Sequence, residues 1–254
     1  MVYENKSYGI GTWRKHLQDI PWFTERAFPL EPSRTALMVI DMTRFQCDKD
    51  APFGVARTMY LKGGKGADYY FATQGPAIAA IRRLIDAFRQ HRMQVVYTTS
   101  GSYFGDGRDR SVNARVQDKG HLAITGIQEP TDTPQFQVIP ELQPQKGDLV
   151  IHKVAQSAFV GSNTDLVLRN MGIDTLVFTG AATHACVESS ARVAVDLSYK
   201  VVLVDDACAS QSPLFHDLTM LHCAMMWGRV LSADQVIEEL SARLPAGRVV
   251  AHTS

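Results

Sequence analysis

The chain has 254 residues, 45% of them hydrophobic, and its 26 basic and 26 acidic residues give a formal net charge of zero. That length accommodates one large α/β domain or two small ones, with enough apolar residues for a substantial core. A balanced charge argues against a nucleic-acid or anionic-membrane partner, since either would require a clustered basic excess. No apolar run approaches the roughly 20 residues that a transmembrane helix needs, so we expect no membrane partner.

The cysteines indicate a reducing compartment. They are spread along the chain without any CxxC spacing, and the polar N-terminus contains no apolar segment of the kind found in secretory signals. We therefore predict reduced thiols and a cytoplasmic location, with one cysteine available for catalysis and the others filling the core. The four cysteines are Cys47, Cys186, Cys208 and Cys223.

Residues 1–34 show no regular hydrophobic period. Aromatic residues stand there among polar residues and prolines, which predicts an N-terminal arm packed on the main domain or on a neighbouring subunit. The remaining residues, 35–254, are predicted to form a single domain. The aromatic residues of the arm include Trp13, Trp22, Phe23 and Phe28.

The first part of this domain alternates strand and helix. A continuous apolar run at 35–41 is typical of a strand buried on both faces. Apolar residues at three- and four-residue intervals predict a helix over 75–92, and a second strand follows at 94–99. Residues 100–147 are rich in Gly, Asp and Pro, and an irregular segment of this length is usually functional.

The alternation resumes after residue 147 and continues to the end of the domain. About six strands alternating with helices predict an α/β fold with one doubly wound, roughly six-stranded parallel sheet and helices on both faces. The later strands are predicted at 148–153, 174–180 and 200–207, the helices at 163–172, 184–199 and 213–227, and a short strand with a final helix at 229–244.

Three reactive side chains follow strands of this sheet. Asp41 ends the first strand, Lys153 ends the third, and Cys186 lies just past the fourth at the start of a helix. Ligands of open parallel sheets bind outside the carboxyl ends of the strands, so we expect the three to meet at one edge. A helix N-terminus and a nearby ammonium are expected to lower the pKa of the thiol, and Asp41 could accept its proton.

Each of these residues also has a structural interpretation. A cysteine at a helix start is more often a small buried hydrophobe, an aspartate ending a strand is often a helix cap, and a lysine there is usually solvated. Their occurrence together at one edge raises the case for catalysis without deciding it.

Several segments resemble the isochorismatase-like cysteine hydrolases. They are ALMVIDMTRFQCD, IHKVAQSAFVGSNTDLVLRN, VFTGAATHACVESSARVAV and PLFHDLTMLHCA, in that order along the chain. The family pattern is an apolar strand ending in Asp-Met, then K-x-x-x-S-A-F, then G-x-x-T-x-x-C-V. The resemblance implies that Asp41, Lys153 and Cys186 form the catalytic triad of this family.

The resemblance also implies a non-proline cis peptide bond, here between Ala181 and Ala182. That bond would direct the Ala182 N–H toward the same point as the Cys186 N–H and form an oxyanion hole. The alternative is that Gly-Ala-Ala is simply a tight strand-to-helix turn.

The resemblance also limits the reactions that we expect the protein to catalyse. Nicotinamidases of the family bind a metal through D-x-H and a further histidine, but residues 98–112 contain no histidine, so we expect no metal and no cofactor. Family members that cleave a vinyl ether lack the nucleophilic cysteine, which Cys186 supplies. The remaining members of the family hydrolyse linear amides and ureides, such as ureidoacrylate, biuret, triuret, N-carbamoylsarcosine and maleamate. Glu188 stands where the N-carbamoylsarcosine and maleamate enzymes have Arg, while Gln156 and Met226 depart from the biuret hydrolases.

We therefore predict a metal-independent cysteine hydrolase that cleaves a C–N bond of a small amide or ureide through a thioester or thiocarbamate, releasing ammonia. It is expected to act on a small molecule as a homo-oligomer, a dimer or tetramer. The alternatives are a catalytically silent binding or structural member of the fold and a hydrolase of a non-amide substrate. The predicted substrate contacts are Phe45, Gln46, Gln156, Phe159 and His184; for the two phenylalanines core packing is an equal alternative, and His184 could instead cap the helix.

Overall fold

The computed structural model describes residues 12–17, 20, 23–51, 54, 65–116 and 133–243. Its centre is a six-stranded parallel sheet in the order β3-β2-β1-β4-β5-β6, which confirms the predicted fold class. The order reverses between β1 and β4, and this is where ligands of such sheets bind. The strands are β1 (Thr35–Ile40), β2 (Gln94–Ser100), β3 (Leu149–Lys153), β4 (Thr175–Ala181), β5 (Lys200–Ala209) and β6 (Arg229–Leu231).

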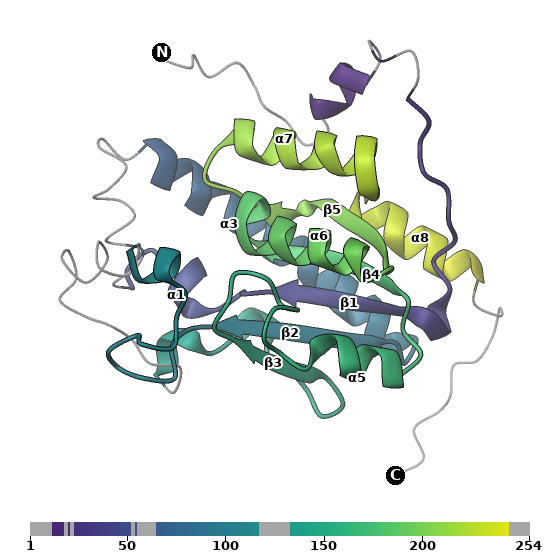
Figure 1. Cartoon of the computed structure of the whole chain (residues 1–254). Helices are drawn as coiled ribbons and strands as arrows, with labels where there is room; N and C mark the ends of the chain where they lie inside the picture. The colour runs from purple at the N-terminus through teal and green to yellow at the C-terminus, as the bar shows by residue number, and fades with distance from the viewer. Residues whose placement is uncertain are drawn as a thin grey trace.

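Helices cover both faces of the sheet (Figure 1). One face packs against α3 (Lys65–Gln90) and α8 (Ala233–Arg243), and the other against α5 (Thr164–Asn170), α6 (Glu188–Asp196) and α7 (Pro213–His222). Successive side chains of a strand point to opposite faces, and β1 shows this directly. Its Leu37 and Val39 belong to the first layer, while Met38 and Ile40 belong to the second.

Helix α3 begins ten residues before the predicted start at residue 75. The apolar period began only after Gly75-Pro76, and proline inside a helix costs roughly 3 kcal/mol. In the structure Pro76 lies inside α3, and the helix continues back past Tyr70, which is fully buried. Burial of a large aromatic side chain outweighs the local preference, as tertiary packing often does.

Two predicted helices contain a π-helical turn that the sequence did not reveal. Helix α6 is preceded by η5 (Thr183–Val187), and α7 is followed by η6 (Cys223–Trp227). Such turns add one residue per turn and occur often at functional sites. In the long segment 100–147, Val138 pairs with Thr43 beside the short turns η3 (Pro134–Phe136) and η4 (Pro140–Leu142). Part of that segment, 117–132, lies outside the described residues.

The described part of the N-terminal arm packs on its own chain. The turn η1 (Thr12–Leu17) lies against α7, and the Trp13 side chain is 1% exposed. Arg26 donates to backbone carbonyls at the end of η6. This agrees with the first of the two predicted placements; Trp22 lies outside the described residues. No helix in the described part of the chain has the length and apolarity needed to cross a membrane.

Candidate active site

Asp41, Lys153 and Cys186 meet at the carboxyl edge of the sheet. The Nζ of Lys153 lies 2.8 Å from Oδ2 of Asp41 and 3.5 Å from Sγ of Cys186. The two charged side chains are almost fully buried, at 0% for Lys153 and 1% for Asp41. The structure thus brings together the three side chains that the sequence placed at this edge.

Backbone conformation and a neighbouring strand hold Asp41 in place. Its φ of 51° lies in the left-handed region, which aspartate tolerates better than most residues and which is common at functional sites. Thr98, on the adjacent strand β2, donates its hydroxyl to Oδ1 of Asp41 at 2.7 Å. One carboxylate oxygen therefore faces Thr98 and the other faces Lys153.

Lys153 has three partners inside the protein. Besides Asp41 and Cys186, its Nζ donates to the carbonyl of Ala155 at 3.1 Å. Burial by itself would lower the pKa of Lys153, but the charge of Asp41 and the contacts with Asp41 and Cys186 outweigh it and raise the pKa overall. The amine is therefore held as an ammonium.

Cys186 lies in the π turn η5 that leads into α6. The peptide bond between Ala181 and Ala182 is cis, which confirms the bond expected from the sequence. The carbonyl of Ala182 accepts the N–H groups of Ala185 and Val187, and Ser190 donates its hydroxyl to the Cys186 carbonyl at 2.6 Å. These bonds fix the turn that carries the sulfur.

The expected low pKa of the Cys186 thiol is wrong. Burial raises the pKa of Cys186 to about 12, the charge of Lys153 lowers it in part, and the adjacent Asp41 raises it again. The sequence argument counted the ammonium and the helix start, but not the loss of solvent around sulfur or the carboxylate that offsets the lysine. In the resting protein Cys186 is a thiol.

The predicted substrate contacts occupy different environments. Gln46, partly buried, accepts a hydrogen bond from the Tyr70 hydroxyl at 3.1 Å. Phe45 stacks on Phe136 with ring centroids 5.1 Å apart. Phe159 is buried and packs against Tyr199 in the core, whereas Gln156 is exposed.

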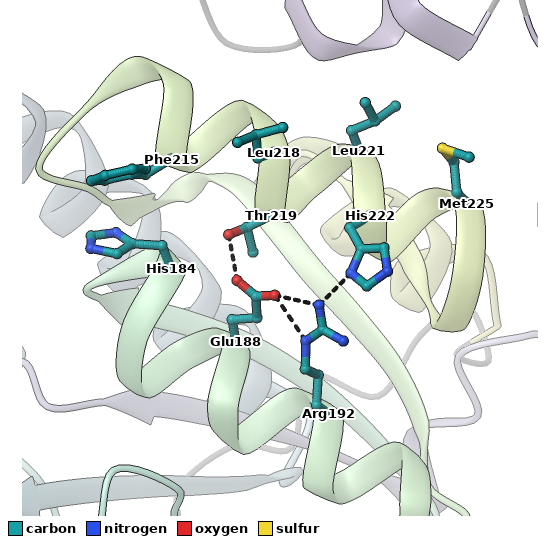
Figure 2. Close-up of a pocket in the computed structure, with 9 residues that line it drawn as sticks. All are labelled: His184, Glu188, Arg192, Phe215, Leu218, Thr219, Leu221, His222 and Met225. Carbon is teal, nitrogen blue, oxygen red and sulfur yellow. Dashed lines mark hydrogen bonds and ion pairs between the residues drawn. The ribbon is translucent and has the colours of Figure 1, made fainter. Parts of the chain in front are cut away.

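His184 faces α7. Its Nδ1 lies 3.0 Å from the Ser210 hydroxyl, and its ring lies beside Phe215 at a hollow of about 440 Å³ between α6 and α7 (Figure 2). Glu188, which stands where the N-carbamoylsarcosine and maleamate enzymes have Arg, also turns into this hollow. There it binds Arg192 and accepts the hydroxyl of Thr219 at 2.7 Å (Figure 2). The hollow does not include Asp41, Lys153 or Cys186 among its lining residues.

Two buried polar groups were missed by the sequence analysis. Thr98 donates a hydrogen bond to Asp41, but the sequence of a strand does not show which residue a hydroxyl within it will bind. Gln74 is 3% exposed, and neither of its amide atoms has a hydrogen-bond partner among the residues that the structure describes. It stands on the buried stripe of α3 between Tyr70 and Ala77, so a polar residue within an apolar helical period was the available signal.

The four cysteines are free thiols, and Cys208 and Cys223 are buried as predicted. Within the described ranges no three His, Cys, Asp or Glu side chains are grouped so that they could hold a metal ion.

The isochorismatase domain model matches residues 35–235. The chain belongs to the isochorismatase family. Relatives in this family include ureidoacrylate amidohydrolase RutB from Agrobacterium fabrum, 32% identical over 231 residues that cover 85% of this chain and 94% of the relative. The RutB of Rhizobium rhizogenes is 30% identical, with coverage of 85% and 87%.

Solved structures agree with this family assignment. A cysteine hydrolase from Pseudomonas syringae pv. phaseolicola superposes with a TM-score of 0.73 at 24% identity, over 87% of this chain and 99% of the other. N-carbamoylsarcosine amidase from Thermoplasma acidophilum has a TM-score of 0.56 at 25% identity, over 79% and 97%. Together these relatives place the isochorismatase-family chain among hydrolases of carbon–nitrogen bonds other than peptide bonds.

Proposed function

We propose that this isochorismatase-family protein is a metal-independent cysteine hydrolase that cleaves a C–N bond of a small linear amide or ureide and releases ammonia. One observation carries the proposal: a single buried ammonium, Lys153, contacts both the Asp41 carboxylate and the Cys186 sulfur. Acid, cation and thiol in contact at the switch point of the sheet supply a base, a charge-balancing group and a nucleophile.

The first half of the reaction moves one proton and exchanges one bond. Asp41 accepts the proton of Cys186 as sulfur attacks the amide or carbamoyl carbon. Since burial raises the thiol pKa, proton transfer and attack occur together. When the C–N bond breaks, Asp41 returns the proton to the departing nitrogen, which leaves as ammonia. The carbonyl carbon remains bound to sulfur as a thioester or thiocarbamate.

Water completes the cycle. Asp41, ionised again, accepts a proton from a water molecule that attacks the same carbon. When the C–S bond breaks, Asp41 returns this proton to the sulfur and Cys186 is again a thiol. In both halves the carbonyl oxygen becomes an oxyanion, for which we propose the backbone N–H groups of Ala182 and Cys186 as donors. The π turn that begins directly after Ala182 and carries Cys186, fixed by the hydrogen bonds to the Ala182 carbonyl, supports this assignment.

Substrate recognition is proposed for the residues predicted from the sequence, Phe45, Gln46, Gln156, Phe159 and His184. To these we add Gln74, because its buried amide offers a donor and an acceptor that no described residue uses. An amide or ureide presents the complementary acceptor and donor. The relatives named for ureidoacrylate and N-carbamoylsarcosine support this substrate class. The homo-oligomeric state and the cytoplasmic location remain predictions.

Ammonia release from a panel of small amides and ureides tests the proposal. The panel contains biuret, triuret, N-carbamoyl amino acids, maleamate, ureidoacrylate analogues and nicotinamide, each with and without a chelator. We expect release that the chelator leaves unchanged and that Cys186→Ser abolishes, while Cys47→Ser, a partly buried cysteine outside the triad, retains it. Activity that survives in Cys186→Ser, or that the chelator removes, would contradict the proposal. So would folded wild-type protein that releases ammonia from no compound.

A further inference from the structure

A buried chain of hydrogen bonds runs from the N-terminal arm to the turn that carries Cys186. Trp13 donates its indole N–H to Oδ2 of Asp205 at 3.0 Å. The other oxygen of Asp205 lies 2.7 Å from Nε2 of His216, and Nδ1 of His216 lies 3.1 Å from the hydroxyl of Thr183. All four residues are at most 9% exposed. The chain therefore joins η1, β5, α7 and η5.

The hydrogen between His216 and Asp205 can be assigned from its chemistry. A carboxylate only accepts, so Nε2 of His216 carries a hydrogen directed at Asp205. The opposite nitrogen, Nδ1, then faces the Thr183 hydroxyl, whose single hydrogen is shared between Nδ1 and the carbonyl of Ala209, each at 3.1 Å. Asp205 thus sets the orientation of the imidazole, and the imidazole sets the position of Thr183.

Thr183 lies at the point where a displacement would affect the sulfur most directly. It is the first residue of η5, immediately after Ala182 and three residues before Cys186. Its side chain is tied to β5 through Ala209 and to α7 through His216. The backbone N–H groups proposed for the oxyanion hole stand on either side of this anchor.

We propose that Asp205 and His216 are positioning residues for the nucleophile turn, and that Trp13 extends this support to the N-terminal arm. The role of the turn rests on the proposed function of Cys186. In the proposed reaction none of these side chains touches substrate. They hold Thr183, and through it the spacing between the Ala182 and Cys186 amides.

The neighbouring carboxylate provides a matched control. Asp206 is the next residue on β5 and points to the opposite face of the sheet, where it accepts the backbone N–H of Ala233 at the start of α8. It shares charge and strand with Asp205 and is partly buried, but no bond among the described residues connects it to Thr183. Trp227, which donates its indole N–H to His222 at 3.4 Å, is the corresponding control for Trp13.

The experiment compares Asp205→Asn with Asp206→Asn, and Trp13→Phe with Trp227→Phe, in the full-length protein. We expect Asp205→Asn to lower kcat by roughly tenfold to a hundredfold with KM changed by less than about threefold, because geometry and not binding is lost. Trp13→Phe, which loses one hydrogen bond, is expected to lower kcat by about threefold to tenfold. Both control variants are expected to retain the wild-type kcat.

A second readout requires no substrate. The rate at which iodoacetamide alkylates Cys186, followed by mass spectrometry, should change in Asp205→Asn and stay constant in Asp206→Asn. If Cys186→Ser retains activity, Cys186 is not the nucleophile and the proposed function is refuted. The alkylation test of positioning would still be valid, because it needs no turnover.

The proposal is overturned if the two Asn variants behave alike in both readouts, whether both lose activity or both keep it. Thr183→Val and Thr183→Ser complete the test in case Asp205→Asn does not fold. Loss of kcat in the valine variant with recovery in the serine variant supports the anchor, whereas equal kcat in the two refutes it.

Discussion

The proton on Cys186 is controlled by Asp41 and by burial together. The thiol would be a stronger nucleophile as a thiolate, yet its pKa is raised to about 12 by loss of solvent and by the adjacent carboxylate. A thiol of this kind reacts when a base removes its proton at the moment of attack. The free protein should therefore not show the reactive cysteine that its lysine neighbour alone would produce.

The raised pKa of Cys186 predicts how the alkylation rate of its thiol depends on pH. Below its pKa an acid is mostly protonated, so the thiolate fraction of Cys186 should rise about tenfold for each pH unit. We expect the iodoacetamide rate at Cys186 to keep rising from about pH 7 to pH 10 without a plateau, as measured by peptide mass spectrometry. A plateau near neutral pH would show that Lys153 outweighs burial.

Alkylation of the Asp41→Asn variant tests the contribution of the carboxylate to the thiol pKa. Removing the carboxylate removes one of the two causes that raise the thiol pKa, so alkylation at fixed pH should become faster. Turnover should be lost, because the proposed base is absent. Slower alkylation together with lost turnover would contradict the charge assignment.

At the scale of single elements, the approach of β1 to β4 depends on one glycine. Gly180 has a φ of +114°, and a Cβ built there would lie 2.1 Å from the carbonyl oxygen of Ile40. Neither the backbone angle nor the neighbouring strand can accommodate a side chain. The clash falls at the end of β1, one residue before Asp41.

Gly180→Ala should destabilise the protein by more than about 3 kcal/mol in urea denaturation, because a core strand would have to move. Gly75→Ala, inside α3 where a Cβ meets nothing within 4 Å, is the control. That change should stabilise the protein by roughly 0.5–1 kcal/mol through helix propensity. Similar effects at the two sites would refute the packing argument.

Helix α3 carries a second element-scale prediction through Gln74. A buried amide without partners costs about 1–3 kcal/mol, so Gln74→Leu should leave stability unchanged or raise it. If the amide binds substrate, KM should rise about tenfold with little change in kcat. Gln90→Leu, at an exposed position of the same helix, is the control for both measurements. An unchanged KM would remove Gln74 from the substrate contacts.

At the scale of the whole molecule, the N-terminal arm is part of the fold. Besides the Trp13 bond, Thr12 donates to Asp217 at 2.8 Å and Arg14 donates to the Val230 carbonyl at 3.0 Å. These partners belong to α7 and β6, far along the chain. The described part of the predicted arm, residues 12–17, therefore contacts the predicted domain at two elements.

Trp13→Ala should lower the free energy of unfolding by about 3–5 kcal/mol, the usual cost of emptying a buried tryptophan site. The wild type should unfold in one transition by circular dichroism and by fluorescence alike, because the arm and the sheet share contacts. Phe104→Ala, at an exposed aromatic residue, serves as the control. Two separate transitions would show that the arm folds independently.

The sequence predicted the sheet from its apolar runs, and it predicted the meeting of Asp41, Lys153 and Cys186 from their places at or just past strand ends. Continuous apolar runs identify parallel strands, and Asp41 and Lys153 stand directly at strand ends. Features that depend on contacts between distant segments were not predictable. The pKa of Cys186 depends on burial, and the start of α3 depends on packing of Tyr70. The hydrogen bond from Thr98 to Asp41 depends on the register between β2 and β1.

The three contacts of Lys153 have a consequence for the durability of the proposed catalyst. In the proposed reaction an acyl group on the sulfur of Cys186 would stand close to the amine, and a free amine attacks thioesters to form a stable amide. Such a transfer from sulfur to nitrogen would inactivate the protein permanently. Because the pKa of Lys153 is raised by its contacts, the nitrogen stays an ammonium and has no lone pair to offer. The same contacts that would balance charge in the proposed reaction would thereby protect the site from modification by the proposed intermediate.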